Sequence, residues 1–168
     1  MIYVTATAVI PRRPEVVWGY LTDVTRLTTW VESLVLADCV TDQKTGVGVT
    51  LDVVRSTRKG RTSATSEVTA WREPELLCVE TRFLGALLFD RARLAPVEVG
   101  PAGSLGAQMG TELVIESELM VGNKVAEIFG RSRGLFGADD TNPFQPIYDR
   151  SLDALARLIE AETMRPYR

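Results

Sequence analysis

Hydrophobic and polar residues alternate over most of the first 120 positions, which is the pattern of a strand with one buried and one wet face. The alternation begins at once, since Val4, Ala6 and Ala8 share one parity of residues 2–10 and Pro11 ends the run. Further strand-like runs, separated by turn residues, are residues 34–40, 46–54, 62–71, 76–84, 87–99 and 111–119. The pattern therefore predicts an antiparallel sheet.

Two short segments after the first strand show helical spacing instead. Pro14 and Glu15 suit the first turn of a helix over residues 14–22, because this turn tolerates proline and favours acidic side chains. Asp23 can cap a second short helix that reaches Trp30.

A longer helix follows Asn142. Asn142 and Gln145 are spaced as in a capping box, and Pro143 fits the first turn. Apolar residues then recur every three or four positions, at Phe144, Tyr148, Leu152, Leu155 and Ile159. This spacing predicts a helix of roughly five turns with one buried face.

The element order predicts an α+β fold. Six consecutive strands form a meander, so the first strand must pair with the last, and the long helix must cover the apolar face of the sheet. No linker divides the chain, and we expect one domain over residues 1–168. Residues 121–141 have no firm assignment, and a lid, a homodimer contact and a disordered loop are all compatible with their sequence.

Composition and charge narrow the function classes. The chain has 168 residues, a net charge of −3 and 45% hydrophobic residues, so it has no global attraction to nucleic acid or anionic membranes. It lacks a run of about 18 apolar residues and a basic N-terminal leader. We therefore expect a cytoplasmic protein with neither a nucleic-acid partner nor integral membrane association.

Histidine is absent, which excludes Ser-His-Asp triads and histidine-based zinc sites. Cys39 falls on the second predicted strand and Cys78 on the fifth, about 14 Å apart at three strand spacings, so we expect no disulfide between them. Neither a metal nor a cofactor is expected.

Several short motifs occur in a characteristic order: Ile10-Pro11, Val17-Trp18, Leu21-Thr22-Asp23, Trp30, Gly46-Val47-Gly48, Glu67-Val68-Thr69 with Pro74, and Gly110-Thr111-Glu112. In this order the chain resembles the START/Bet v 1-like (SRPBCC) superfamily, also called the polyketide cyclase/dehydrase and lipid-transport group. The resemblance implies a helix-grip fold, in which seven antiparallel strands curve around the C-terminal helix. It also implies a hydrophobic cavity between them for a lipid, isoprenoid, polyketide or aromatic ligand.

The strand period suggests which residues line that cavity. We expect inward side chains at Leu51, Val53, Ser66, Thr81, Phe83, Phe89, Arg91, Ser117 and Leu119. Tyr148 and Leu152 would close the cavity from the helix, and Trp18 and Trp30 would lie near its wall or mouth. The polar members would orient a ligand. The alternative is a filled core whose small polar residues bond to backbone.

Three functions remain open. A carrier or sensor that binds a small hydrophobic molecule is the leading hypothesis, because no catalytic constellation is evident. A polyketide or aromatic cyclase or dehydratase would need a proton acceptor and a carbonyl-polarising group, for example Arg91 with Tyr148. The third hypothesis is a protein-interaction module of the same fold. The basic residues Arg55, Arg58, Lys59 and Arg61 are interpreted as a solvated hairpin turn.

Overall fold

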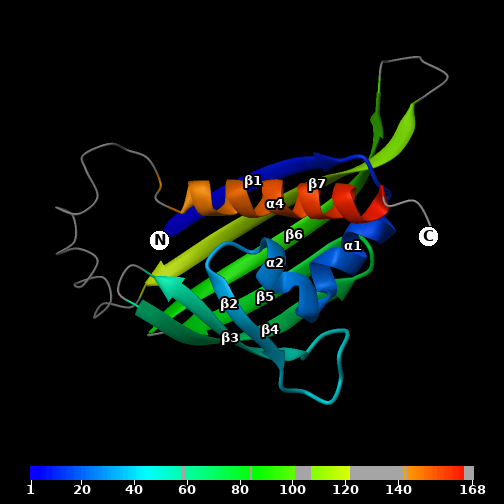
Figure 1. Ribbon diagram of the computed structural model, residues 1–168. Helices are drawn as coiled ribbons and strands as arrows, with labels where there is room; N and C mark the ends of the chain where they lie inside the picture. Colours follow the sequence, from blue (N-terminus) through cyan, green and yellow to red (C-terminus); the bar gives the residue numbers. More distant parts are fainter. Residues whose placement is uncertain (58–59, 84, 101–106, 122–141, 143, 165–168) are drawn as a thin grey trace.

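A seven-stranded antiparallel sheet curves around one long helix in the computed structural model (Figure 1). The structure describes residues 1–57, 60–83, 85–100, 107–121, 142 and 144–164. The strands are β1 (Ile2–Ile10), β2 (Leu34–Cys39), β3 (Thr50–Thr57), β4 (Gly60–Arg72), β5 (Leu76–Phe83), β6 (Ala86–Val99) and β7 (Gln108–Val121). The helices are α1 (Pro14–Thr22), the 3-10 helix η1 (Val24–Arg26), α2 (Leu27–Trp30) and α4 (Gln145–Thr163).

The strand order is β1-β7-β6-β5-β4-β3-β2, which confirms that the first strand pairs with the last. The β1–β7 ladder runs from Ile2 opposite Leu119 to Ile10 opposite Thr111. Each remaining strand pairs with its neighbour in sequence, as in a meander. The predicted α+β helix-grip fold is therefore confirmed.

Two local predictions are wrong. The strand predicted from residue 46 begins at Thr50, because Gly46 and Gly48 adopt φ values of 95° and 90° that turn the chain, and this leaves Val47 57% exposed. The capping box at Asn142 does not form. Phe144 is the N-cap of α4 and makes no side-chain cap hydrogen bond, while the Asn142 amide oxygen accepts from the Phe144 N–H.

The cysteines occupy the predicted strands. Cys39 lies on β2 and Cys78 on β5, with β3 and β4 between them, and both are free thiols. Residues 121–141 fall outside the described residues, apart from Val121 at the end of β7.

The main core fills one end of the space between the sheet and α4. Leu113, Leu155 and Ile159 are fully buried there, because α1 covers this end. Trp18 of α1 packs edge-to-face on Trp71 of β4, with ring centroids 5.1 Å apart and planes at 84°. We call this region the closed end.

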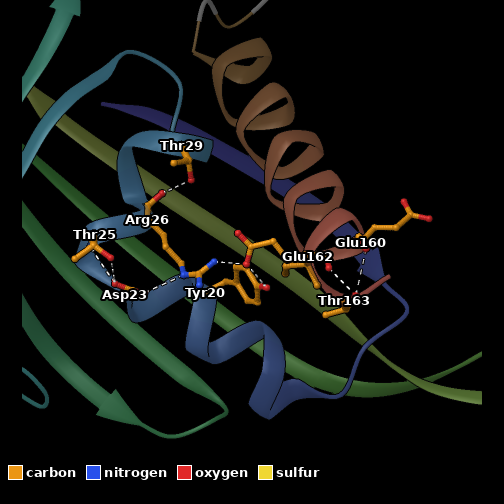
Figure 2. A network of polar contacts seen from close by, with 9 residues as sticks. Tyr20, Asp23, Thr25, Arg26, Thr29, Glu160, Glu162 and Thr163 are labelled. Carbon is orange, nitrogen blue, oxygen red and sulfur yellow. Dashed lines mark hydrogen bonds and ion pairs between the residues drawn. The ribbon is translucent and has the colours of Figure 1, made fainter. Parts of the chain in front are cut away.

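A polar network fastens the closed end (Figure 2). Arg26 of η1 forms an ion pair with Glu162 of α4, and the Tyr20 hydroxyl donates to the same carboxylate at 2.7 Å. Asp23 accepts from the Thr25 N–H at 3.0 Å, which confirms its predicted role as a cap. The segment α1–η1 is thus tied to the last turns of α4.

A second ion pair lies further along the same helix. Arg150 donates to Glu32, with an Nη2–Oε1 distance of 2.8 Å, and the Glu32 N–H donates to the Ser151 hydroxyl at 2.9 Å.

Among the described residues no helix is both long and apolar enough to cross a lipid bilayer.

Candidate functional site

The register of the sheet decides which side chains face α4. Because neighbours across a ladder share a face, Leu51, Ser66, Thr81, Leu88 and Leu119 form one inward row across five strands. The next inward row contains Val68, Val79, Asp90, Ser117 and Val4. Both rows lie on the concave face of the sheet.

Most residues predicted for the cavity lie on this concave face or on the elements that cover it. Ser66, Thr81, Ser117, Val53 and Leu119 are buried, and Leu51 and Phe83 are half-buried. Leu152 is buried on α4, and Tyr148 is half-buried against the core. Trp18 and Trp30 are buried on α1 and α2.

Two predicted residues face the other way. Phe89 lies opposite Glu80 and Glu118, and Arg91 lies opposite Glu116 with its side chain 59% exposed, so both are on the convex face. The prediction took Phe89 and Arg91 as the inward positions of this strand from the strand period. In the β5–β6 ladder Leu88 lies opposite Thr81, which faces inward. The even-numbered residues of β6 therefore face inward and the odd-numbered residues face outward.

Asp90 takes the inward place that was predicted for Arg91. Its Oδ1 accepts hydrogen bonds from the hydroxyls of Ser117 on β7 and Tyr148 on α4, the latter at 2.8 Å. Asp90 was missed, although the sequence holds a signal for it. Charged Arg91 and Arg93 alternate along the strand with apolar Ala92 and Leu94. Ala92 and Leu94 are buried, and Asp90 lies on their face of the strand.

Burial raises the pKa of the Asp90 carboxyl above its ordinary value. Its two hydrogen bonds and the positive charge of Arg55 offset only part of this rise. Burial, and next the charge of Asp90, likewise raise the pKa of Tyr148, so its phenol keeps the proton that it donates to Asp90. The Asp90 carboxyl therefore lies in a poorly hydrated site, where the neutral hydroxyl groups of Ser117 and Tyr148 donate hydrogen bonds to it.

Arg55 belongs to this site and not to a solvated turn. It lies on the concave face in register with Thr62 and Leu34, and it is half-buried. Its charge lowers the pKa of both Asp90 and Tyr148. Arg61, from the same basic group, is exposed on β4, and residues 58–59 lie outside the described part of the chain.

A second polar pair lies next to Asp90 on the sheet. The hydroxyls of Ser66 and Thr81 are hydrogen-bonded to each other at 2.8 Å, and both residues are buried. Four adjacent strands, β4 to β7, therefore bring polar side chains together on this part of the concave face: Ser66, Thr81, Asp90 and Ser117. We call these four residues the polar strip. Tyr148 of α4 covers it.

Burial decreases along α4 from the closed end toward the polar strip. Leu155 and Ile159 are inaccessible to solvent, whereas Phe144 and Tyr148 at the start of the helix are half-buried. Leu88 and Phe83 on the facing strands are half-buried too. The start of α4 and the strand ends that face it are thus less deeply buried than the closed end, whereas Ser66, Thr81 and Ser117 of the strip are themselves buried.

One buried donor on the covering helices is unsatisfied. The indole Nε1 of Trp30 is buried and has no hydrogen-bond partner within the part of the chain that the structure describes. An unpaired buried N–H group costs about 1–3 kcal/mol, so such groups are uncommon in proteins without a reason.

Open depressions lie on other parts of the described surface. One, of about 350 Å³, is lined by residues of β3, β4 and β5, and another, of about 370 Å³, lies between η1 and β2. Glu80 and Arg82 form an ion pair on the convex face. No cluster of three or more His, Cys, Asp or Glu residues within the described ranges could hold a metal ion.

The fold is shared with solved structures that differ widely in sequence. The TTHA0849 protein of Thermus thermophilus is 16% identical, with 96% of this chain and 99% of that chain covered and a TM-score of 0.70. A norcoclaurine synthase point mutant from Thalictrum flavumn, solved with a transition-state analogue, is 12% identical, with 96% of each chain covered and a TM-score of 0.60.

Ara h 8.0201 is 9% identical, with 95% of this chain and 98% of that chain covered and a TM-score of 0.55.

No curated protein matches the sequence. The model of one family, described as polyketide cyclase/dehydrase and lipid transport, matches residues 1–160. The chain therefore belongs to the polyketide cyclase/dehydrase and lipid transport family, whose fold the structure reproduces.

Proposed function

We propose that this chain is a single ligand-binding domain that holds a small hydrophobic molecule between the concave face of the sheet and α4, as a carrier or sensor. The observation that carries the proposal is the polar strip with Tyr148, in which hydrogen-bonded polar side chains of four strands and α4 converge on the concave face. Ligand sites of this kind are mostly apolar with a few convergent polar groups.

The energetics of Asp90 support a role in binding. An inward carboxyl with a raised pKa weakens the fold, because its charged form is poorly hydrated. An apolar residue at this position would be easier to bury. Perturbed carboxyls of this kind concentrate at functional sites.

The test uses N-phenyl-1-naphthylamine, a neutral apolar fluorescent probe, together with native mass spectrometry of freshly purified protein. Saturable binding at micromolar concentration, or a co-purified apolar molecule, is the expected result. Leu88 and Leu87 offer a matched pair, because they are adjacent on β6, both half-buried, and face opposite sides of the sheet. Leu88→Glu is expected to weaken probe binding at least tenfold, and Leu87→Glu to leave it unchanged.

Circular dichroism establishes that each variant is folded, and Leu88→Ala replaces Leu88→Glu if the latter is not. Equal binding by the two glutamate variants would place the probe elsewhere and overturn the proposal. Absence of both probe binding and a co-purified ligand would also overturn it, and would favour the interaction module.

A cyclase or dehydratase is the second candidate function, and the inward pair of Asp90 and Tyr148 specifically favours it. Ionised Asp90 could remove a proton from the carbon next to a ketone, leaving the electron pair on an enolate oxygen near the charge of Arg55. The test is deuterium exchange of 2-tetralone in D₂O. Exchange that wild type accelerates and Asp90→Asn does not would support catalysis, and equal rates would exclude it for this ketone.

A further inference from the structure

The hydrogen bonds around Asp90 define what a ligand must offer there. Ser117 and Tyr148 each carry one hydroxyl proton, and both protons are donated to Oδ1 of Asp90. When Asp90 is ionised, what these three side chains can still present to a ligand is therefore acceptor capacity. It consists of the second carboxylate oxygen and the hydroxyl lone pairs.

Charge limits the ligand further. A ligand anion near Asp90 would meet a carboxylate of the same sign. A ligand cation would meet Arg55, which is close enough for its charge to act on both Asp90 and Tyr148. The combination of one inward carboxylate and one inward guanidinium therefore favours a neutral group.

The residues paired with the cluster across the neighbouring strands are apolar. Asp90 lies opposite Val79 on β5, and the inward neighbours of Ser117 on β1 and of Thr81 on β6 are Val4 and Leu88. A ligand donor that reaches Asp90 is thus shielded from water, where a hydrogen bond to a charged acceptor is strongest.

We propose that the site formed by Asp90, Ser117 and Tyr148 recognises a neutral hydroxyl or phenol group on the hydrophobic ligand, with Asp90 as the acceptor. This rests on the proposed function and deepens it, because it names the polar group by which the ligand is selected. Ser117 and Tyr148 are positioning residues that hold the carboxylate.

The test compares 2-naphthol with 2-methoxynaphthalene at pH 8. The two probes differ in one respect that matters here, since the methyl ether cannot donate a hydrogen bond. Wild type is expected to bind 2-naphthol roughly tenfold or more tightly, as a hydrogen bond to a charged acceptor implies. Asp90→Leu is expected to reduce the ratio to about one without weakening binding of the ether.

Asp52→Leu is the matched control, because Asp52 lies on the convex face of β3 and the same change there should leave the ratio at its wild-type value. If Asp90→Leu does not fold, Asp90→Asn serves instead. It keeps an acceptor without the charge, so its ratio should fall between wild type and one.

The two proposals fail in different ways. Saturable but equal binding of the two probes by wild type would overturn hydroxyl recognition and leave ligand binding intact. A ratio unchanged by the Asp90 substitution would also overturn it. Binding of neither probe would overturn the proposed function, and this inference with it.

Discussion

Asp90 is a single residue whose burial couples its protonation to folding. Its carboxyl is inward, bonded to Ser117 and Tyr148, and its pKa is raised mainly by burial. A group whose pKa is higher in the folded state holds its proton over a range of pH in which the unfolded chain has lost it. The folded state is then favoured at low pH and disfavoured at high pH.

This gives a prediction for Asp90→Asn. As pH rises from the ordinary carboxyl pKa of 3.8 to the raised native pKa, the free energy of unfolding of wild type falls, because the folded protein must give up a proton that it binds more tightly than the unfolded chain does. Asparagine does not titrate, so the variant shows no such fall. The variant should therefore gain stability relative to wild type as pH rises, by about 1.4 kcal/mol for each unit of pKa elevation. Urea unfolding at pH 4, 6 and 8 measures the difference. A difference independent of pH would contradict a raised pKa at Asp90.

At the scale of elements, β7 and its neighbours pack closely around Gly110. A Cβ atom added there would collide with Cγ2 of Val99 and would lie 2.9 Å from the backbone oxygen of Ile10. The second contact is with backbone, which cannot rotate away. The close approach of β1, β6 and β7 thus depends on the missing side chain.

Gly110→Ala should therefore lower the free energy of unfolding by about 1–3 kcal/mol. Gly19→Ala is the matched control. Gly19 is exposed within α1 and an added Cβ meets nothing within 4 Å, so alanine should stabilise this helix by up to about 1 kcal/mol. Urea unfolding of both variants tests the pair, and a Gly110→Ala protein as stable as wild type would be inconsistent with the packing.

The elements were predicted well because alternation and turn residues are local signals. Residues 2–10 and 14–22 were predicted with the observed bounds, and the pairing of β1 with β7 followed from the element order. The failures have local causes too. Gly46 and Gly48 delayed β3, since an alternating sequence cannot show that a positive φ interrupts it.

The site was predicted only in part, because it depends on register between strands far apart in sequence. Ser66, Thr81, Ser117 and Tyr148 were expected to face inward and do so. Their pairing depends on ladders, such as Asp90 opposite Ser117, that the sequence of one strand does not specify. For β6 the prediction chose the odd-numbered residues Phe89 and Arg91 as inward. The β5–β6 ladder instead turns the even-numbered residues inward, Asp90 among them.

At the scale of the whole molecule, stability is concentrated at the closed end. Leu155 of α4 is inaccessible to solvent and belongs to the core shared by the sheet, α1 and α2. Leu155→Ala should lower the free energy of unfolding by about 2–5 kcal/mol, because the cavity left behind cannot collapse fully. For a domain stable by about 5–15 kcal/mol, this is a large fraction.

Leu36→Ala is the control for that prediction, since the same substitution at a 45% exposed position of β2 should change the free energy of unfolding by no more than about 0.5 kcal/mol. Chemical denaturation monitored by tryptophan fluorescence measures both variants. Similar losses for the two leucines would mean that the closed end is not where the molecule is held together.

The separation of the closed end from the polar strip also has a consequence for evolution. Substitutions among the half-buried residues near the strip alter the shape and polarity of the concave face there and leave no cavity in the main core. Chains only 9–16% identical nonetheless keep the same fold. Inheritance of the scaffold and divergence of the surface near the strip can therefore proceed independently, through mutations in different parts of one sheet.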